Sequence, residues 1–153
     1  MSQTPAELLA AYKSNGKEFA EVAASIPAAD LNKAMPGGEW PPAFVIHHMV
    51  DAELHFATRY LHILTSDKPT IINFAEEAYP DRTHYSQRSA AESIALYKSI
   101  HAVIENILEN ASESDWERKG VHFELGEIPM KQFFAKAVGH NAEHAQQLRD
   151  LMA

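Results

Sequence analysis

Histidine is the residue type in this sequence with the greatest capacity for chemistry. The chain has nine histidines and no cysteine, which excludes disulfides, thiolate metal ligands and a cysteine nucleophile. His140 and His144 are four residues apart, a spacing that places both imidazoles on one face of a helix, one turn apart. Because Phe133, Ala137 and Leu148 follow the same stripe, we expect the pair to lie among core positions.

Two interpretations of this pair stay open. Two neutral imidazoles in an apolar stripe need a partner for every ring nitrogen, and a divalent metal satisfies one nitrogen of each ring at once. Alternatively, the pair is satisfied by hydrogen bonds or faces water at the edge of the helix. With nine histidines in 153 residues, the spacing alone does not decide between them.

A second group of histidines falls on one predicted helix. His48, His55 and His62 recur every seven residues, away from the broad apolar side of that helix, which indicates a solvated face for His55 and His62. His48 lies near the helix start, level with a site at one end of a bundle. Asp51 is placed either to orient the His48 imidazole or to be a surface charge. His47 is rotated by about 100° from His48, so only one of them can face a given point.

The remaining candidates are weaker. His101 falls on the inner stripe of a predicted helix, where it either lines the same cavity or is a satisfied core histidine. The sequence has no Ser-His-Asp order, no Gly-rich phosphate loop and no Glu-x-x-His repeat of the kind used by di-iron bundles.

Four predicted helices must position these histidines. Capping boxes at Thr4–Glu7 and Ser89–Glu92 mark two of the helix starts. Between the last two helices, the stretch from Val121 to Ile128 forms either a short hairpin or an extended loop. Helices are predicted from Thr4 to Pro27, from the Pro41-Pro42 pair to about Thr65, from Ser89 to about Asn110, and from Met130 to about Met152.

The lengths of the connections predict the architecture. Ser66 to Arg88 is a connection of over twenty residues, which is typical of a crossover, so we expect a single all-α domain over residues 1–153, a four-helix bundle. The two shorter links favour antiparallel neighbours, and the long link allows the second and third helices to run parallel. With Tyr79, Arg82 and Tyr85, the long connection either forms part of a pocket wall or is an exposed crossover.

Composition excludes several function classes. Hydrophobic residues make up 46% of the chain, and 13 basic against 21 acidic residues give a formal net charge of −8, so we expect no nucleic-acid partner. No apolar run approaches the ~18 residues of a membrane span, and the N-terminus lacks an export signal, so a cytoplasmic location is expected. The broad apolar side of the second helix is either bundle core or a homodimer surface.

Several motifs together resemble the DinB-like metalloprotein family. They are Trp40, His48, Asp51 and Glu53, followed by His140-x-x-x-His144-x-x-Gln147-Leu148. The segments His47–Asp51 and Asp67–Ile71 resemble the branch that contains bacillithiol-dependent S-transferases and proteins named as metal-dependent hydrolases. The resemblance implies an up-down-down-up bundle and a three-histidine site for a divalent metal, commonly Zn or Ni, with His48, His140 and His144 as ligands.

Three imidazoles leave at least one coordination position open, as in catalytic metal sites. The leading hypothesis is a transferase that holds a low-molecular-weight thiol as thiolate and directs it at an electrophile. Because the chain has no cysteine, this thiol must come from outside. A small-molecule hydrolase with water as nucleophile and a non-catalytic metal-binding stress protein are the alternatives. Glu143 stands where the thiol-transferase pattern has a denser histidine cluster, which weakens the transferase assignment.

Overall fold

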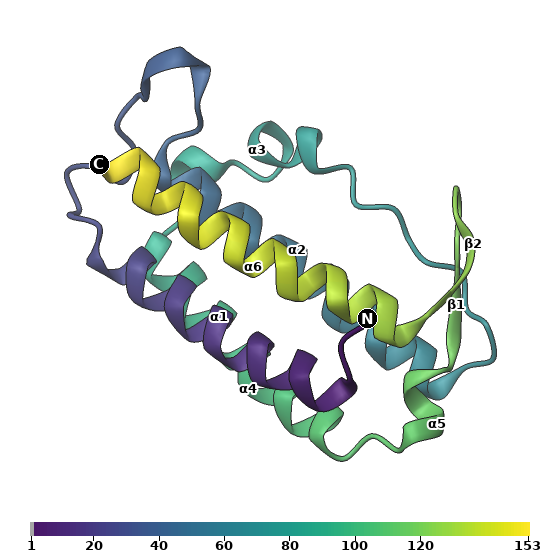
Figure 1. The fold of residues 1–153 in the computed structure, drawn as a ribbon. Helices are drawn as coiled ribbons and strands as arrows, with labels where there is room; N and C mark the ends of the chain where they lie inside the picture. The colour runs from purple at the N-terminus through teal and green to yellow at the C-terminus, as the bar shows by residue number, and fades with distance from the viewer. Residues whose placement is uncertain (1) are drawn as a thin grey trace.

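The computed structural model describes residues 2–153 and contains the four long helices that the sequence predicts (Figure 1). None of the helices in residues 2–153 is both long enough and apolar enough to cross a membrane. The long helices are α1 (Pro5–Ser25), α2 (Pro42–Thr65), α4 (Ala90–Glu109) and α6 (Met130–Met152).

Local sequence explains where these helices begin. At the start of α1, the Thr4 hydroxyl accepts a hydrogen bond from the Glu7 backbone N–H, and the Glu7 carboxylate accepts one from the Thr4 N–H. This capping box satisfies two backbone donors that a helix start leaves free. At the start of α4, only one half of the predicted box forms, in which the Ser89 hydroxyl accepts from the Glu92 N–H.

Short elements fill the connections. The segment after α4 contains an antiparallel hairpin in which Val121 pairs with Glu127, so the hairpin prediction is confirmed over the extended-loop alternative. The short helices and strands are η1 (Pro36–Gly38), η2 (Glu76–Ala78), α3 (Tyr79–Arg82), η3 (Tyr85–Gln87), α5 (Glu113–Trp116), β1 (Lys119–His122) and β2 (Gly126–Pro129).

The packing of the long helices differs from the expected neighbours. α1 packs mainly against α4 and α6, and α2 packs mainly against the same two helices. The expectation that the shorter links join neighbouring helices is therefore wrong, because α1 and α2 lie across the bundle from each other, as do α4 and α6. The segment between α1 and α2 runs from residue 26 to 41, and α5 with the hairpin lengthens the connection to α6. Both links are long enough to cross one end of the bundle.

Side-chain contacts fix how the helices run alongside one another. Lys13 in the first half of α1 pairs with Glu109 at the end of α4, and Glu18 in the second half of α1 pairs with Arg149 in the last turn of α6. Arg118, which leads into the hairpin, donates to the backbone oxygen of Ile63 in the last turn of α2 at 2.7 Å. The ends of α2 and α4 and the start of α6 therefore meet at the hairpin end of the bundle.

The long crossover between α2 and α4 runs over one face of α2, although most of its residues are exposed. Its first part pairs with β1, where the Ile71 N–H donates to the Val121 oxygen at 2.9 Å and the Val121 N–H donates to the Pro69 oxygen at 2.8 Å. Further along, Tyr85 is fully buried. This cover turns the histidine-bearing face of α2 into the wall of a cleft.

Candidate metal centre

Three histidines from two helices direct their Nε2 atoms at one point. The Nε2 atoms of His48 and His140 are 3.1 Å apart, and those of His140 and His144 are 3.0 Å apart. The ligand atoms of all three residues lie within 4.8 Å of one another. The structure therefore brings together the complete predicted ligand set, from positions 92 residues apart in the chain.

Helix geometry explains this convergence. His140 and His144 are one turn apart on α6, so their rings meet edge to face with centroids 4.4 Å apart. α2 packs against α6 and supplies His48, which is 2% exposed. His48 lies on the face of α2 opposite its main apolar side, and the sequence pattern therefore indicated that it points outward. In the structure this face is covered by the crossover, and His48 is buried for that reason.

Burial keeps these imidazoles in the neutral, metal-ligating form. Desolvation, together with the smaller effect of the neighbouring histidines, lowers the pKa of His48 to about 4 and the pKa of His140 to about 3. Desolvation also lowers the pKa of His144. At neutral pH all three rings therefore offer uncharged nitrogens.

The donor set is of the type that binds a divalent metal, and two of its separations match a tetrahedral site. Three nitrogens that each lie about 2.0–2.1 Å from one zinc ion at tetrahedral angles are roughly 3.3 Å apart, and the His48–His140 and His140–His144 pairs are 3.1 and 3.0 Å apart. The three ligand atoms together span up to 4.8 Å, so the rings must draw closer to ligate one ion. Without a shared cation or proton, the lone pairs of adjacent Nε2 atoms would face each other. His48, His140 and His144 are therefore the residues that could hold such an ion.

A glutamine one turn along α6 fixes the third imidazole. The Nδ1–H of His144 donates to Oε1 of Gln147 at 2.7 Å, which leaves the Nε2 lone pair directed at the cluster. The sequence offered the spacing of three residues that makes this bond possible, but it did not single out Gln147 for this role.

Asp51 does not orient His48, so that interpretation is wrong. Its carboxylate accepts two hydrogen bonds from the Arg88 guanidinium at 2.8 and 3.0 Å and one from the Tyr85 hydroxyl at 2.7 Å. Asp51 is 6% exposed, so it is not a surface charge either. It instead anchors the end of the crossover to α2.

The cluster opens into a cleft of about 590 Å³ between α2, α6, the crossover and the hairpin. Aromatic side chains form much of its wall, including Trp40, whose ring meets that of His48 with centroids 5.5 Å apart. The crossover does form part of this wall, but through a different set of residues from those expected, because none of Tyr79, Arg82 and Tyr85 lines the cleft. The lining residues from the crossover are Asn73, Phe74, Glu76 and Glu77.

The other histidines have separate environments. His55 was expected on a solvated face, but it lines the cleft, stacks on Phe74 and lies 2.6 Å from the Tyr79 hydroxyl. His62 is exposed, as expected. His47 points elsewhere, with its Nδ1 2.8 Å from the Ser93 hydroxyl.

His101 is not part of this cavity. Its ring stacks on Tyr12 with centroids 4.0 Å apart, and its Nε2 lies 3.5 Å from the carboxylate of buried Glu53. The Tyr12 hydroxyl donates to the same carboxylate oxygen at 2.9 Å. His101 is therefore a core histidine, but it is not the satisfied one that was expected, because neither of its ring nitrogens has a hydrogen-bond partner.

Comparisons with known proteins agree with this architecture. The chain is 27% identical over 149 residues to "Putative metal-dependent hydrolase GK0616" of Geobacillus kaustophilus, covering 95% of this chain and 82% of the relative. It is 25% identical over 132 residues to an Oceanobacillus iheyensis protein whose name also describes a putative metal-dependent hydrolase, covering 84% and 74%.

Two solved structures share the fold. YfiT from Bacillus subtilis, described as a probable metal-dependent hydrolase with an unusual four-helix bundle topology, superimposes with a TM-score of 0.85 at 18% identity, covering 99% of this chain and 90% of YfiT. A mycothiol-dependent maleylpyruvate isomerase superimposes with a TM-score of 0.75 at 12% identity. The match covers 99% of this chain but 62% of the isomerase. At these identities the likeness concerns the fold alone.

The model of the DinB superfamily matches residues 11–148, which include all four long helices in large part and all three converging histidines. The chain therefore belongs to the DinB superfamily.

Proposed function

We propose that this chain is a divalent-metal-dependent transferase that activates a low-molecular-weight thiol for attack on an electrophile. The observation that carries the proposal is the convergence of three neutral histidine nitrogens on one point at the wall of a large cleft. The names of its relatives support metal dependence, and the mycothiol dependence of one structural neighbour supports an external thiol. We propose Zn or Ni as the metal.

When bound, the metal would supply positive charge that lowers the pKa of a thiol or water at its open position. Residues of the chain would hold the ion and shape the site around it. His48, His140 and His144 would hold the ion, and Gln147 keeps the His144 ring in the ligating orientation. Aromatic side chains also line the site, among them Phe74, whose ring stacks on His48 with centroids 5.7 Å apart.

One observation favours a hydrolase as the second candidate. A carboxylate oxygen of Glu76 lies 3.8 Å from Nε2 of His48, and the Glu76 side chain is half exposed at the cleft. A carboxylate in this position could accept a proton from a water molecule that attacks a substrate in the cleft. In the transferase, the same group could accept the proton of the thiol.

The testing experiment begins with metal content and continues with a thiol titration. We expect the purified protein to bind one divalent ion, and His140→Ala to lose it while keeping most of its helix content. His62→Ala is the matched control, because His62 is exposed and lies outside the cluster. Stoichiometric metal in His140→Ala would show that the ligand assignment is wrong.

Spectra of the cobalt-substituted protein then separate the candidates. A thiolate-to-cobalt charge-transfer band on addition of 2-mercaptoethanol supports the transferase. Hydrolysis of 4-nitrophenyl acetate that stops on chelation and falls in Glu76→Gln, with no such band, supports the hydrolase instead. Metal binding with neither result indicates a non-catalytic metal-binding protein.

The proposal also includes an order of the long helices, a homodimer, and a cellular location with a class of substrate. The contacts of Lys13, Glu18 and Arg118 support an up-down-down-up order of the long helices. Leu54 and Leu61, each 44% exposed on α2, supply apolar surface for the proposed homodimer. A cytoplasmic location and small-molecule substrates, with no nucleic-acid partner, complete it.

A further inference from the structure

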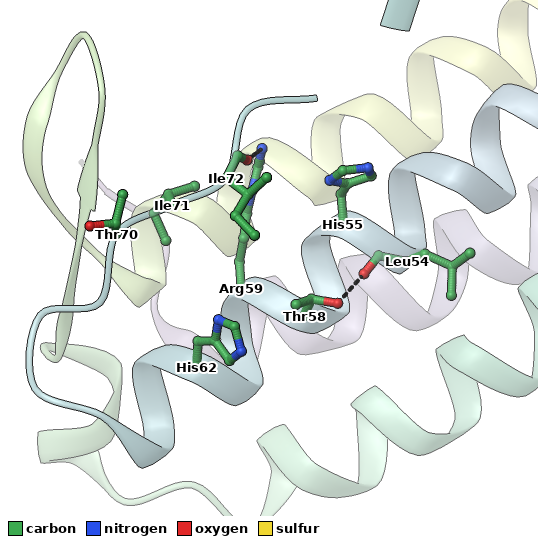
Figure 2. A pocket seen from close by; sticks show the side chains of 8 residues that line it. All are labelled: Leu54, His55, Thr58, Arg59, His62, Thr70, Ile71 and Ile72. Carbon is green, nitrogen blue, oxygen red and sulfur yellow. Dashed lines mark hydrogen bonds between the residues drawn. The ribbon is translucent and has the colours of Figure 1, made fainter. Parts of the chain in front are cut away.

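Arg59 is a half-buried cation in the cleft wall whose hydrogen-bonding capacity is largely unused. Its guanidinium donates one hydrogen bond, to the Ile72 backbone oxygen at 3.2 Å, and lies over the Phe56 ring. Its buried Nε has no hydrogen-bond partner. Figure 2 shows Arg59 rising from α2 towards the crossover at Ile72, between His55 and His62.

No carboxylate in residues 2–153 forms an ion pair with this guanidinium. Lys136, on the opposite wall of the cleft, is also without an ion pair. The chain has 21 acidic and 13 basic residues, and Arg59 and Lys136 are two of the six basic residues that form no ion pair within residues 2–153. Seven of the 13 basic residues do form ion pairs, namely Lys13, Lys17, Lys33, Lys68, Arg88, Lys119 and Arg149. Two cations without acidic partners thus face the same cleft.

The charged residues are distributed unevenly along the cleft. Arg59 follows His48 by eleven residues on α2, about 16 Å along the helix axis, and Lys136 precedes His140 by one turn of α6. Both cations therefore lie on the hairpin side of the histidine cluster. The carboxylates of η2, Glu76 and Glu77, line the cleft from the crossover, with Glu76 beside His48. A third carboxylate, Glu124, belongs to the hairpin turn.

An arginine with free planar donors is suited to bind a carboxylate through paired, charge-assisted hydrogen bonds. The neighbouring surface suits an apolar chain that leads to such a group, because Phe56, Phe123 and Leu125 also line the cleft. We propose that Arg59, assisted by Lys136, binds a carboxylate that the substrate carries at the end remote from its reacting atom. This deepens the proposed function, on which it rests for placing the reacting atom at the three histidines.

The test compares a thiol acid with its uncharged analogue. Calorimetry on the zinc-loaded full chain measures the affinities of 6-mercaptohexanoate and 6-mercaptohexanamide. We expect the acid to bind about tenfold more tightly or better, and Arg59→Gln to reduce this preference to about twofold or less without changing the affinity for the amide. Arg59→Lys should keep part of the preference. Arg82→Gln, which alters an exposed arginine outside the cleft, should keep all of it.

Equal affinities for acid and amide in the wild type would overturn the proposal, as would a full preference in a folded Arg59→Gln. Loss of the Arg59–Ile72 hydrogen bond alone would weaken both probes equally, so the ratio of affinities separates carboxylate binding from a structural role. If Arg59→Gln does not fold, the wild-type ratio and the partial preference of Arg59→Lys decide the question.

Sulfur-free probes separate this inference from the thiol chemistry. An Arg59-dependent preference for hexanoate over hexanamide, without a charge-transfer band for any thiol, supports the carboxylate site and contradicts the transferase. A charge-transfer band for a thiol, without any preference for acids over amides, supports the transferase and contradicts the carboxylate site. Displacement of hexanoate by 6-mercaptohexanoate but not by 6-mercaptohexanamide assigns the carboxylate to the thiol. Simultaneous binding of hexanoate and 6-mercaptohexanamide assigns it to the electrophile.

Discussion

Gly16 on α1 lies directly against the imidazole of His101 on α4. A Cβ atom on residue 16 would be 2.4 Å from both Cε1 and Nδ1 of that ring. The ring cannot easily move away, because it stacks on Tyr12 and contacts Tyr97. The glycine that interrupts the apolar stripe of α1 is therefore the residue that lets α1 and α4 approach around a buried histidine.

We predict that Gly16→Ala destabilises the protein by about 1–3 kcal/mol, because the added methyl group overpacks the His101 ring. Helix propensity alone would favour alanine by about 1 kcal/mol. Gly139→Ala on α6 is the matched control, since a Cβ there meets nothing within 4 Å, and it should be neutral or stabilising. Urea unfolding measures both changes. Equal effects of the two substitutions would contradict the packing argument.

The bond between His144 and Gln147 predicts a specific effect on metal affinity. Gln147→Leu should weaken zinc binding by about 10–100-fold, because the imidazole loses the acceptor that orients it. Gln146→Leu is the control, as Gln146 is exposed on the same helix and bonds Asp150. Competition with a chromogenic chelator gives both dissociation constants. An unchanged affinity in Gln147→Leu would mean that packing alone sets the ring orientation.

Buried histidines predict that the metal-free protein loses stability in acid. The folded pKa values of His48 and His140, about 4 and about 3, lie below the ordinary value of 6.5. The folded state therefore binds fewer protons than the unfolded state, so this stability is present above pH 6.5 and is lost as the pH falls from 6.5 towards 3. Bound metal should dissociate in the same direction, since protons compete for its ligands.

The measurement is the free energy of unfolding of chelator-treated protein by urea between pH 7 and pH 4. His48→Phe removes one of the titrating groups, so we expect the difference in free energy between wild type and variant to change by about 1–3 kcal/mol across this range. A constant difference would show that His48 titrates normally in the folded chain.

Local signals were sufficient to predict the long helices, while the contacts between them were not predictable. The capping box at Thr4 and the prolines at residues 42 and 129 depend on neighbours in sequence, so they located the helix starts correctly. Which helices pack together depends on the links, whose path has no periodic signal. The prediction of neighbours failed for this reason.

The same distinction applies to the site. The spacing of His140 and His144 and the family motif placed the ligands that the structure brings together. The periodicity of the second helix indicated that His48 points outward. This prediction failed because periodicity within one helix carries no information about the crossover that covers that face of the helix. Periodicity also could not show that Asp51 contacts Arg88, 37 residues away, or that Arg59 lacks an acidic partner. These features depend on tertiary contacts.

The hairpin gives the cleft a part that can vary independently of the bundle. Its turn carries Phe123 and Leu125, which are 58% and 65% exposed, yet both line the cleft. Insertions at such a surface turn are tolerated because they leave the frame intact. Proteins that keep the three histidines could therefore change which molecule they bind by altering a few residues between the two strands. Such changes would leave the packing of the four long helices unaffected.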